Sequence, residues 1–327
     1  MKTVSLQTHH GPTNLAIMEH LLKNLEEDFF LLFENRNTLI VGRHQNTDDE
    51  VNPTFVKRHR PTILRRLSGG GAVYQDIGNL NVVFITSATH FNDFTRFTSP
   101  ILNVLRNLGL DARFTGRNDI TIDGKKVSGN AQVKHGTRMM HGATILFDAD
   151  LTSIANALTP DRQKLADKGV KSVRARIQNV KPLLPSPMCI NQFKDLIMHE
   201  VLGGEANAEH VYHLTDDDLR QIEAIQRARY ENRDWNVGKS PSLTHHVITR
   251  TAFGTLSVRY AIRNNHLTDL AIHSDALTDT DHIDVEAFFR GVELTGGSLL
   301  ERASEAKAEG YDAALIDAIV DCLSKVT

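Results

Sequence analysis

Hydrophobic residues recur at regular spacing along most of the chain. Apolar residues from Leu15 to Leu25 share one face at helical spacing, which predicts an amphipathic helix over residues 13–25. Residues 29–33 and 38–42 are apolar runs joined by a polar turn, and they predict two strands. The chain therefore opens with a helix followed by strands, the pattern of a mixed α and β protein.

The same periodicity predicts the elements that follow. Expected strands cover residues 79–85 and 141–147, and expected helices cover 54–60, 101–108, 151–158, 190–201 and 216–230. Pro100 suits the first turn of the helix that contains Ile101, and Gly109 is placed to end it. The helix over 216–230 has Thr215 as its expected N-cap.

A compositional break at residues 234–241 separates the C-terminal part of the chain. Beyond it, residues 244–274 contain three alternating strands, and 282–290, 298–308 and 311–324 have helical spacing. We therefore expect two domains, residues 1–243 and residues 244–327, the second a small unit of strands followed by helices.

Residues 65–76 combine two arginines with three consecutive glycines. Arg65 and Arg66 stand just before Ser68 and the glycines 69–71. Glycine lets the backbone turn sharply and approach a ligand closely, and arginine suits phosphate and carboxylate. The segment predicts either an anion-binding loop or a hairpin corner with solvated arginines. It matches neither the P-loop nor the dinucleotide glycine pattern.

A second candidate segment runs from residue 116 to residue 132. Asp123-Gly124 between alternating runs predicts a hairpin, which makes Asn118-Asp119 and Ser128-Gly129 neighbours across one ladder. Asp119 and Lys126 on this hairpin can serve magnesium and phosphate respectively, or they can form a surface ion pair.

Composition excludes several classes of protein. Lysine and arginine number 37 against 40 acidic residues, so the net charge of −3 predicts no bulk attraction to nucleic acid. The only cysteines, Cys189 and Cys322, form neither a metal-binding pattern nor a disulfide framework. No apolar run approaches the roughly 20 residues that span a bilayer. We expect a soluble cytoplasmic protein that binds neither nucleic acid nor membrane.

Several of these motifs together resemble the lipoate–protein ligase family, in the family's order and at its spacings. The resemblance covers residues 1–241 strongly, and the C-terminal part matches the family's accessory domain in size and pattern. The matching segments are Arg-Arg-x-Ser-Gly-Gly-Gly-Ala-Val-Tyr at 65–74, Gly-Arg-Asn-Asp at 116–119, Lys-Val-Ser-Gly-x-Ala at 126–131, His-Gly-x-Thr-x-Leu at 141–146, the basic run at 168–176 and Trp-Asn-x-Gly at 235–238.

The resemblance implies an α+β fold: a catalytic domain of the biotin/lipoate ligase type with a mixed sheet, and a small α+β accessory domain. It implies ATP as co-substrate, with Mg²⁺. Lipoate is first activated to lipoyl-AMP, and the lipoyl group then passes to a lysine of an acceptor. The implied acceptors are lipoyl domains of 2-oxoacid dehydrogenase acyltransferase subunits and the glycine cleavage H protein.

The resemblance also implies roles for particular residues. Lys126 is the expected catalytic residue, a fixed cation that contacts both the nucleotide and lipoate. The basic segment 165–181 is expected to be a mobile loop that closes over the adenylate. Expected ATP-binding residues are Arg66, Gly71, Ala72, Val73, Tyr74, Asn118, Asp119 and Lys126; expected lipoate-binding residues are Ser68, Gly70, Lys126, Gly129 and His141; the expected metal ligand is Asp119.

Two other classes of protein remain as alternatives. An octanoyltransferase of the same fold works through a thioester on cysteine. In those relatives a cysteine lies near the position of Gly116-Arg117, and here both cysteines lie outside every motif. A non-catalytic lipoyl-protein-binding module would be expected to lose Arg66, the glycines or Lys126. The chain also departs from the family pattern at Gln75, Val133 and Val237, which bears on substrate preference more than on the reaction.

Overall fold

The computed structural model describes residues 1–4, 6, 8–115, 118–158, 176–204, 208–238, 243, 245–276 and 282–324. It divides into two compact units. The first unit comprises residues 1–41, 47–67 and 72–237, and the second comprises residues 42–46, 68–71 and 238–327. Two short loops therefore group with the C-terminal residues: loop 42–46, and loop 68–71, which contains the glycine run. The expected division has a single boundary after residue 243, and it therefore assigns both loops to the first domain.

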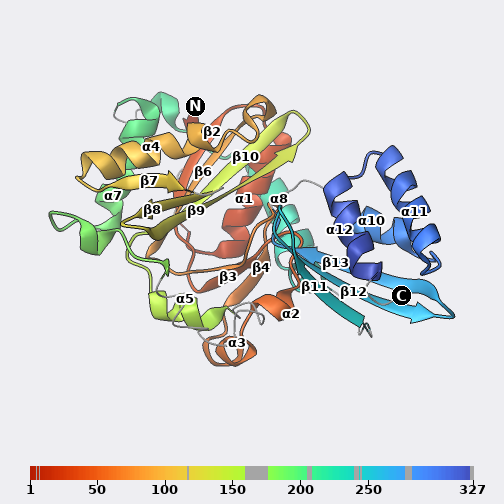
Figure 1. Cartoon of the computed structure of the whole chain (residues 1–327). Coiled ribbons are helices and arrows are strands. Elements are labelled where there is room, and N and C mark those ends of the chain that lie inside the picture. The colour runs from red at the N-terminus through yellow and green to blue at the C-terminus, as the bar shows by residue number, and fades with distance from the viewer. Residues whose placement is uncertain are drawn as a thin grey trace. The chain divides into compact units, whose positions relative to one another are not determined.

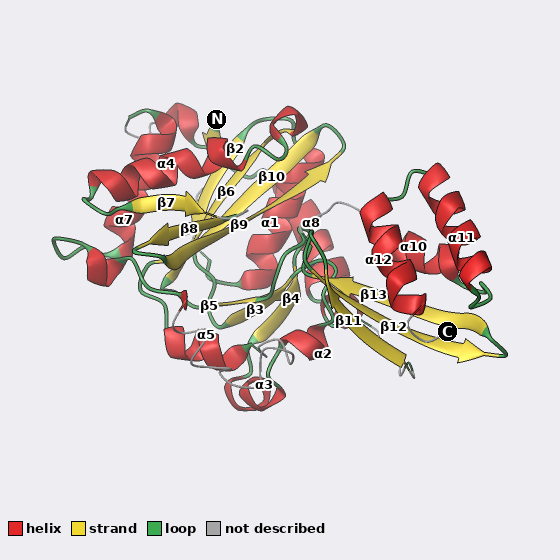
Figure 2. Ribbon diagram, viewed as in Figure 1, coloured by secondary structure: helices red, strands yellow, loops and turns green. Residues whose placement is uncertain are grey.

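The first unit contains two sheets (Figures 1 and 2). Its strands are β1 (Lys2–Thr3), β2 (Phe29–Phe33), β3 (Thr38–Val41), β4 (Thr62–Arg65), β5 (Val73–Gln75), β6 (Asn79–Ser87), β7 (Ala112–Thr115), β8 (Asp119–Ile122), β9 (Lys125–His135) and β10 (Arg138–Leu146). Its helices are α1 (Gly11–Asn24), α2 (Thr47–Glu50), α3 (Pro53–His59), α4 (Phe94–Asn107), α5 (Leu151–Ala157), α7 (Ile190–Leu202), α8 (Asp216–Ile225) and α9 (Arg233–Asn236).

The larger sheet has seven strands in the order β1-β2-β6-β10-β9-β8-β7. Only the pair of β1 and β2 is parallel, and the other neighbours are antiparallel. The smaller sheet has the order β4-β3-β5, with β3 parallel to β4 and antiparallel to β5. The fold is α+β with mixed sheets, as the family resemblance implies.

Alternating side chains give the large sheet two apolar faces. One face carries residues such as Phe84 and Ile145 and packs against α4 and α7. The other face carries residues such as Val83 and Met140 and packs against α1, with Ile40 and Leu64 of the small sheet in the same core. Helices α3 and α5 pack on the remaining face of the small sheet. The helices on the two sides of the large sheet can be followed in Figure 2.

Three details of the first unit differ from the sequence expectations. Strands β2 and β3, expected as a pair joined by a turn, lie in different sheets. Helix α4 begins at Phe94 because Asp93 caps it, so Pro100 lies inside the helix and the expectation that it occupies the first turn is wrong. The helix expected to run to residue 230 ends at Ile225, and residues Gln226–Tyr230 form a π-helix.

The second unit is a three-stranded antiparallel sheet with three helices. The sheet order is β11 (His245–Arg250), β12 (Thr255–Arg263) and β13 (His266–Ser274), and the helices are α10 (His282–Phe289), α11 (Gly296–Ala308) and α12 (Ala313–Ser324). One apolar cluster, which includes Tyr260, Phe289 and Ile319, forms its core. The expected order of strands and then helices is confirmed. Among the helices of the described ranges, none is both long and apolar enough to cross a bilayer.

Candidate functional site

The hairpin of β8 and β9 forms at the predicted place. Asp123 and Gly124 have φ values of 50° and 74°, the left-handed values that a tight two-residue turn requires. The register then pairs Asp119 with Gly129, as the sequence predicts. A bulge between Ile120 and Thr121 places Lys126 opposite Thr121, near the start of β9. The hairpin therefore brings the candidate cation and the candidate carboxylate together.

Lys126 and Asp119 form an ion pair across this hairpin. The Lys126 Nζ lies 2.7 Å from Asp119 Oδ1, and the two side chains are 39% and 35% exposed. Both can therefore still be reached by a ligand. A Cβ built on Gly129 would lie 2.9 Å from Lys126 Nζ and 3.0 Å from its Cε. Because Gly129 has no side chain, the lysine can lie along the strand toward Asp119.

Asn118 fixes the end of the hairpin through its neighbour in β9. Its Nδ2 donates to the Asn130 carbonyl oxygen at 2.7 Å, and its own carbonyl accepts from Asn130 Nδ2 at 3.0 Å. The Asn130 backbone N–H donates to the same Asn118 carbonyl at 2.9 Å. These bonds hold Asp119 in register with Gly129. Further along the chain, Ile177 bridges to Lys126, and the backbone N–H of Gln178 donates to the Lys126 carbonyl.

The two adjacent arginines have different surroundings. Arg65 is buried, and its guanidinium donates to the carbonyl of Trp235 and to the hydroxyl of Thr47, both at 2.9 Å. Arg66 is partly buried, and burial lowers its pKa to about 10, with nearby Glu50 opposing this shift and Arg65 adding to it. Arg66 is thus still protonated at neutral pH. Of the pair, Arg66 is the better candidate for a ligand contact.

Ala72 follows the glycine run and leads into β5, residues Val73–Gln75, an edge strand of the small sheet. An edge strand presents backbone N–H and C=O groups to a neighbouring chain or ligand. The Tyr74 side chain points into the core, where its hydroxyl donates to Asn37 Oδ1 at 3.1 Å and its ring meets Phe55 edge-on. Any contact of Ala72, Val73 and Tyr74 with a nucleotide is therefore best made by their backbone.

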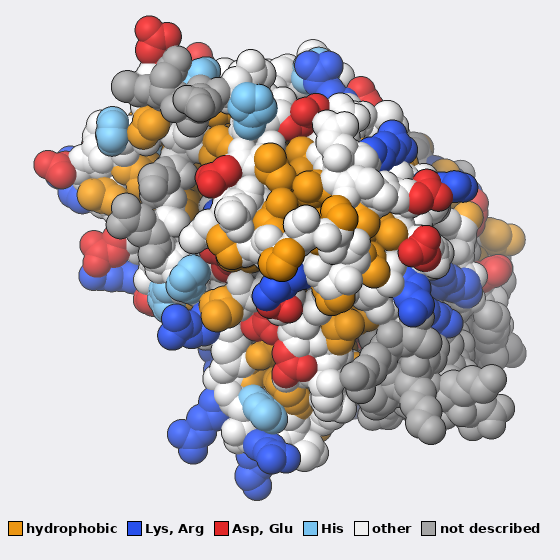
Figure 3. Space-filling view, turned by 90° about the vertical axis from the view of Figure 1, so that its left-hand side faces the viewer, with side chains coloured by type: hydrophobic (Ala, Val, Ile, Leu, Met, Phe, Trp, Pro, Cys, Tyr) orange, Lys and Arg blue, Asp and Glu red, His pale blue; other side chains and the backbone are white. Residues whose placement is uncertain are grey.

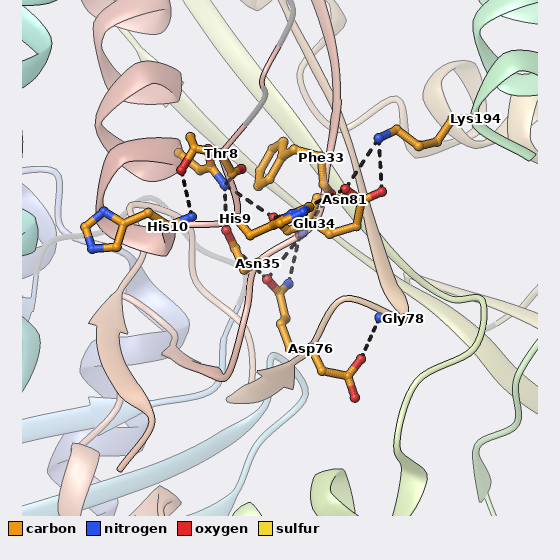
Figure 4. Close-up of polar contacts among 12 residues, drawn as sticks. Thr8, His9, His10, Phe33, Glu34, Asn35, Asp76, Gly78, Asn81 and Lys194 are labelled. Carbon is orange, nitrogen blue, oxygen red and sulfur yellow. Dashed lines mark hydrogen bonds and ion pairs between the residues drawn. The ribbon is translucent and has the colours of Figure 1, made fainter. Parts of the chain in front are cut away.

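Gln75 belongs to a buried network of amides that joins the two sheets of the first unit. Its partners Asn35 and Asn81 are labelled in Figure 4. Its Oε1 accepts from Asn35 Nδ2 at 2.7 Å, and its Nε2 donates to Asn81 Oδ1 at 2.8 Å. Asn35 Oδ1 in turn accepts from Asn14 Nδ2 at 2.8 Å. The side-chain amide of Gln75 is fully used, which holds β5 in place. Beside this network, Lys194 of α7 binds the buried Glu34 carboxylate at 3.0 Å.

Ser68, Gly70 and Gly71 belong to the second unit. The Ser68 carbonyl accepts from the Arg43 backbone N–H at 2.9 Å, and the Gly70 backbone N–H donates to the Ala276 carbonyl at 3.0 Å. Gly70 has a φ of 91°, a conformation that a side chain would strain. The glycine run is therefore a turn held by backbone bonds to residues of the second unit.

The structure does not bring His141 to the other candidate residues. His141 pairs with Gln132 and Phe84, so it points to the face of the large sheet that packs on α4. It is fully buried, stacks on Phe97 at 4.9 Å, and hydrogen-bonds to Gln132 and Asn130. Burial lowers the pKa of His141 to about 3, which keeps the ring neutral. Direct contact with lipoate, as expected from the resemblance, is not supported by this position.

The opposite face of the same strands carries a strip of small and apolar residues, of which the sequence analysis names only Gly129 as a lipoate-binding residue. Register pairs Gly129 with Thr144, Ala131 with Gly142, and Val133 with Met140, and all six point away from α4. Apart from Met140, each of them stays partly exposed. A Cβ built on Gly142 would meet no atom within 4 Å. The strip extends along β9 from Gly129, beside Lys126, for about 13 Å at the rise of a strand.

Among the described residues, the titratable side chains form no large metal-binding cluster. Within the ranges that the structure describes, no group of three or more His, Cys, Asp or Glu side chains could hold a metal ion. Magnesium, however, is often held by one or two carboxylates together with substrate phosphates, and the accessible Asp119 fits that use. On the face drawn in Figure 3, acidic and basic side chains alternate around hydrophobic ones. Most of the basic 165–181 segment lies outside the described residues, as do Gly116 and Arg117.

Comparison with known protein families gives two matches that together span most of the chain. Residues 10–202 match the model of the lipoyl protein ligase A/B catalytic domain. Residues 240–323 match the model of the bacterial lipoate protein ligase C-terminus.

Curated relatives and solved structures agree with these matches. The chain is 39% identical to lipoate–protein ligase 1 of Staphylococcus aureus, over 88% of each chain. It is 35% identical to the lipoate-protein ligase LplJ of Bacillus subtilis, over 85% of this chain and 86% of that one. The crystal structure of P. falciparum LipL1 in complex with lipoate has a TM-score of 0.77 at 21% identity, with 99% of both chains covered. That of lipoate-protein ligase A bound with ATP has a TM-score of 0.62 at 23% identity, over 72% of this chain and 98% of the other. The two structures establish a shared fold.

Proposed function

The chain belongs to the lipoate–protein ligase family, and we propose how its residues carry out the family's reaction. The enzyme is an ATP-dependent ligase. The carboxylate of lipoate attacks the α-phosphorus of ATP, which gives lipoyl-AMP and releases pyrophosphate. The ε-amine of an acceptor lysine then attacks the carbonyl carbon of this mixed anhydride, forms an amide and releases AMP.

Lys126 is the proposed catalytic residue, and the observation that carries this assignment is its placement against Asp119 and Gly129. Negative charge develops on the phosphate oxygens in the first step and on the lipoyl carbonyl oxygen in the second. A cation held at their junction stabilises both transition states. Lys126 is not the nucleophile, because the attacking amine comes from the acceptor protein.

Arg66, Asn118 and Asp119 are the proposed side chains on the nucleotide side. Arg66 is charged and its side chain is partly exposed, so it suits a phosphate contact. Asp119 is the proposed ligand of Mg²⁺, which would neutralise phosphate charge when it is bound with ATP. Ala72, Val73 and Tyr74 are proposed to contact ATP through the backbone of the edge strand.

The strip along β9 and β10 is the proposed floor for the lipoyl tail. Its small residues leave room over Gly142, and Val133 and Met140 give it an apolar far end. It begins at Gly129, so the carboxyl end of the acid would lie beside Lys126. The roles of Ser68 and Gly70 toward lipoate, and of Gly71 toward ATP, stay proposals. For His141 we propose support of β9 and β10 in place of the expected lipoate contact.

The proposed acceptors are the lipoyl domains of 2-oxoacid dehydrogenase acyltransferase subunits and the glycine cleavage H protein. One structural neighbour supports a lipoyl domain as partner. It is described as a bipartite lipoate protein ligase with its E2 lipoyl domain from Thermoplasma acidophilum, and it has a TM-score of 0.64 at 24% identity. That neighbour covers 75% of this chain.

Replacement of Lys126 tests the proposed mechanism. Lys126→Met keeps an unbranched side chain of similar length and removes its charge, so it is expected to slow lipoyl-AMP formation and transfer from supplied lipoyl-AMP by about 10²–10³-fold each. Lys125→Met is the matched control, because Lys125 is the exposed neighbouring lysine on the same strand. A Lys126→Met enzyme within about threefold of wild type in both steps would remove Lys126 from the mechanism.

A further inference from the structure

One row of paired residues crosses the large sheet beside Lys126. The register pairs Asp119 of β8 with Gly129 of β9, Gly129 with Thr144 of β10, and Thr144 with Asn81 of β6. Side chains of directly paired residues point to the same face of a sheet, with their Cβ atoms about 4.5–5.5 Å apart. The Thr144 side chain therefore lies on the face of the strip, next to Gly129.

The Lys126 ammonium lies over the same row. It binds Asp119 at 2.7 Å, and a Cβ built on Gly129 would lie 2.9 Å from it. Because that Cβ would point to the face of the strip, the ammonium lies on this face too. An ammonium and the Thr144 hydroxyl thus flank Gly129, which has no side chain to separate them. Both Lys126 and Thr144 are partly exposed, so a ligand can reach them.

The Gln75 amide approaches Thr144 from the small sheet. Its Nε2 donates to Thr144 Oγ1 at 3.2 Å and to Asn81 Oδ1 at 2.8 Å. A backbone carbonyl only accepts, so it shows which end of a neighbouring amide is the donor. Asn81 Nδ2 donates to the Phe33 carbonyl at 3.3 Å, and Asn81 Oδ1 therefore faces Gln75. This end of the network requires the Gln75 nitrogen to lie toward Asn81 and Thr144.

The other end of the network gives Gln75 the same orientation. Asn14 Nδ2 donates to the Thr8 carbonyl at 3.2 Å and to Asn35 Oδ1 at 2.8 Å. Asn35 Nδ2 then faces Gln75 and donates to its Oε1 at 2.7 Å. With its oxygen bound to Asn35, Gln75 presents its nitrogen to Thr144.

This orientation makes Thr144 Oγ1 an acceptor toward Gln75, so the hydrogen of the Thr144 hydroxyl points elsewhere. Among the described residues, the acceptor for that hydrogen is Asn81 Oδ1, which lies 3.5 Å away and already accepts from Gln75. Hydrogen bonds between a hydroxyl and an oxygen are typically about 2.7–2.8 Å long. A hydroxyl that itself accepts a hydrogen bond is also a stronger donor. A ligand oxygen over Gly129 would therefore be the better partner for Thr144.

We propose that Thr144 is a further substrate-binding residue, whose hydroxyl donates to the carboxylate of lipoate, and that Gln75 is its positioning residue. The proposal rests on the proposed function, in which the carboxyl end of the acid lies beside Lys126. The carboxylate would lie over Gly129, with one oxygen toward the Lys126 ammonium and the other toward the Thr144 hydroxyl. Hydrogen bonds to a charged group are stronger than those between neutral groups, so this contact contributes directly to the affinity for lipoate.

Steady-state kinetics of lipoate-dependent pyrophosphate exchange in the full chain test this contact. Thr144→Val keeps the shape of the side chain and removes its hydroxyl, so it is expected to raise the KM for lipoate about tenfold and to leave the KM for ATP nearly unchanged. Thr144→Ser restores the hydroxyl and should recover most of the affinity. Thr268→Val, at a partly exposed threonine of β13, is the matched control. An unchanged KM for lipoate in Thr144→Val, or a rise in the KM for ATP instead, would overturn the proposal.

Octanoate separates contact with the carboxylate from contact with the dithiolane ring. It carries the same carboxylate and lacks the ring, so we expect its inhibition constant against lipoate to rise in Thr144→Val by the same factor as the KM for lipoate. A loss for lipoate alone would place Thr144 against the ring and contradict the proposed contact.

A double mutant tests the role of Gln75. Gln75→Met removes the amide that orients Thr144, and it is expected to raise the KM for lipoate by about threefold to tenfold. Added to Thr144→Val, it should raise that KM no further, because Gln75 acts through the hydroxyl. Multiplicative effects would overturn the positioning role, and the Thr144 variants test the ligand contact independently of this result. Failure of the wild-type protein to show lipoate-dependent exchange would instead overturn the proposed function itself.

Discussion

At the scale of single residues, neighbours of the same type divide by their surroundings. Arg65 is buried and is bound to Trp235 and Asn236 through its backbone and its guanidinium, whereas the Arg66 side chain is partly exposed. Gly129 gives room to Lys126, whereas Gly142 opens onto empty space. The sequence predicts the types of residue that the chemistry needs. It does not predict this division, because the partners of Arg65 lie some 170 residues away.

Gly129→Ala is expected to slow the reaction through Lys126. The added Cβ would lie 2.9 Å from the Lys126 Nζ, which must move, while the fold survives because the displaced atoms end a flexible side chain. A rate loss of up to roughly 100-fold is expected in both half-reactions, with little change in melting temperature. The control is Gly297→Ala at the start of α11, where an added Cβ meets nothing within 4 Å. Full activity of folded Gly129→Ala would contradict the placement of Lys126.

At the scale of elements, local signals predicted most helices and strands, and the exceptions have identifiable causes. The Asp123-Gly124 turn was predicted because both residues accept the left-handed backbone that it needs. Strands β2 and β3 were correctly predicted as strands, but their separation into two sheets depends on pairing with β6 and β4, far along the chain. The short strands β4, β5 and β7 have three or four residues each, too few for a periodic signal.

His141 illustrates how an element can decide the role of a motif residue. Strand alternation turns it away from Lys126 and into the core under α4, where burial lowers its pKa to about 3. Below about pH 6.5, His141 is protonated in the unfolded chain but stays neutral in the native state. The free energy of unfolding therefore falls as the pH falls toward 3, and then levels off. Between pH 8 and pH 5 this residue is expected to remove about 2 kcal/mol from the free energy of unfolding.

Urea unfolding at pH 8 and pH 5 measures that contribution. In His141→Gln the neutral amide can still hydrogen-bond to Asn130, and it does not titrate in this range. The drop in unfolding free energy between the two pH values should be smaller in His141→Gln than in wild type by about 2 kcal/mol. Equal drops in the two proteins would show that His141 titrates normally.

At the scale of the whole molecule, the two matched family models cover residues of both units. The units themselves are not two continuous segments of the sequence. The loops 42–46 and 68–71 group with the C-terminal residues. Composition locates a break near residue 238. It does not show that the loops 42–46 and 68–71 group with the C-terminal residues, because backbone bonds such as that of Gly70 with Ala276 leave no sequence pattern. The sequence motifs include Gly129, Ala131, Gly142 and Thr144, but they do not show that these residues share one face, because that face depends on the register of β9 and β10.

The cysteines distinguish the ligase from a thioester-forming transferase of the same fold. Cys189 is exposed at the start of α7, and Cys322 is buried in the core of the second unit. A protein with both Cys189→Ser and Cys322→Ala is expected to lipoylate an acceptor domain within about threefold of the wild-type rate, because no thioester forms. Loss of turnover in the folded double variant would favour the transferase.

Lipoate-dependent exchange of pyrophosphate into ATP tests the central claim most directly. A ligase forms lipoyl-AMP reversibly before any acceptor is present, so labelled pyrophosphate should enter ATP only when lipoate is added, and Lys126→Met should lower this rate by about 10²–10³-fold. An acyl transferase and a binding module have no adenylate to exchange. Absence of lipoate-dependent exchange in the folded wild-type protein, supplied with ATP and Mg²⁺, would contradict the assignment.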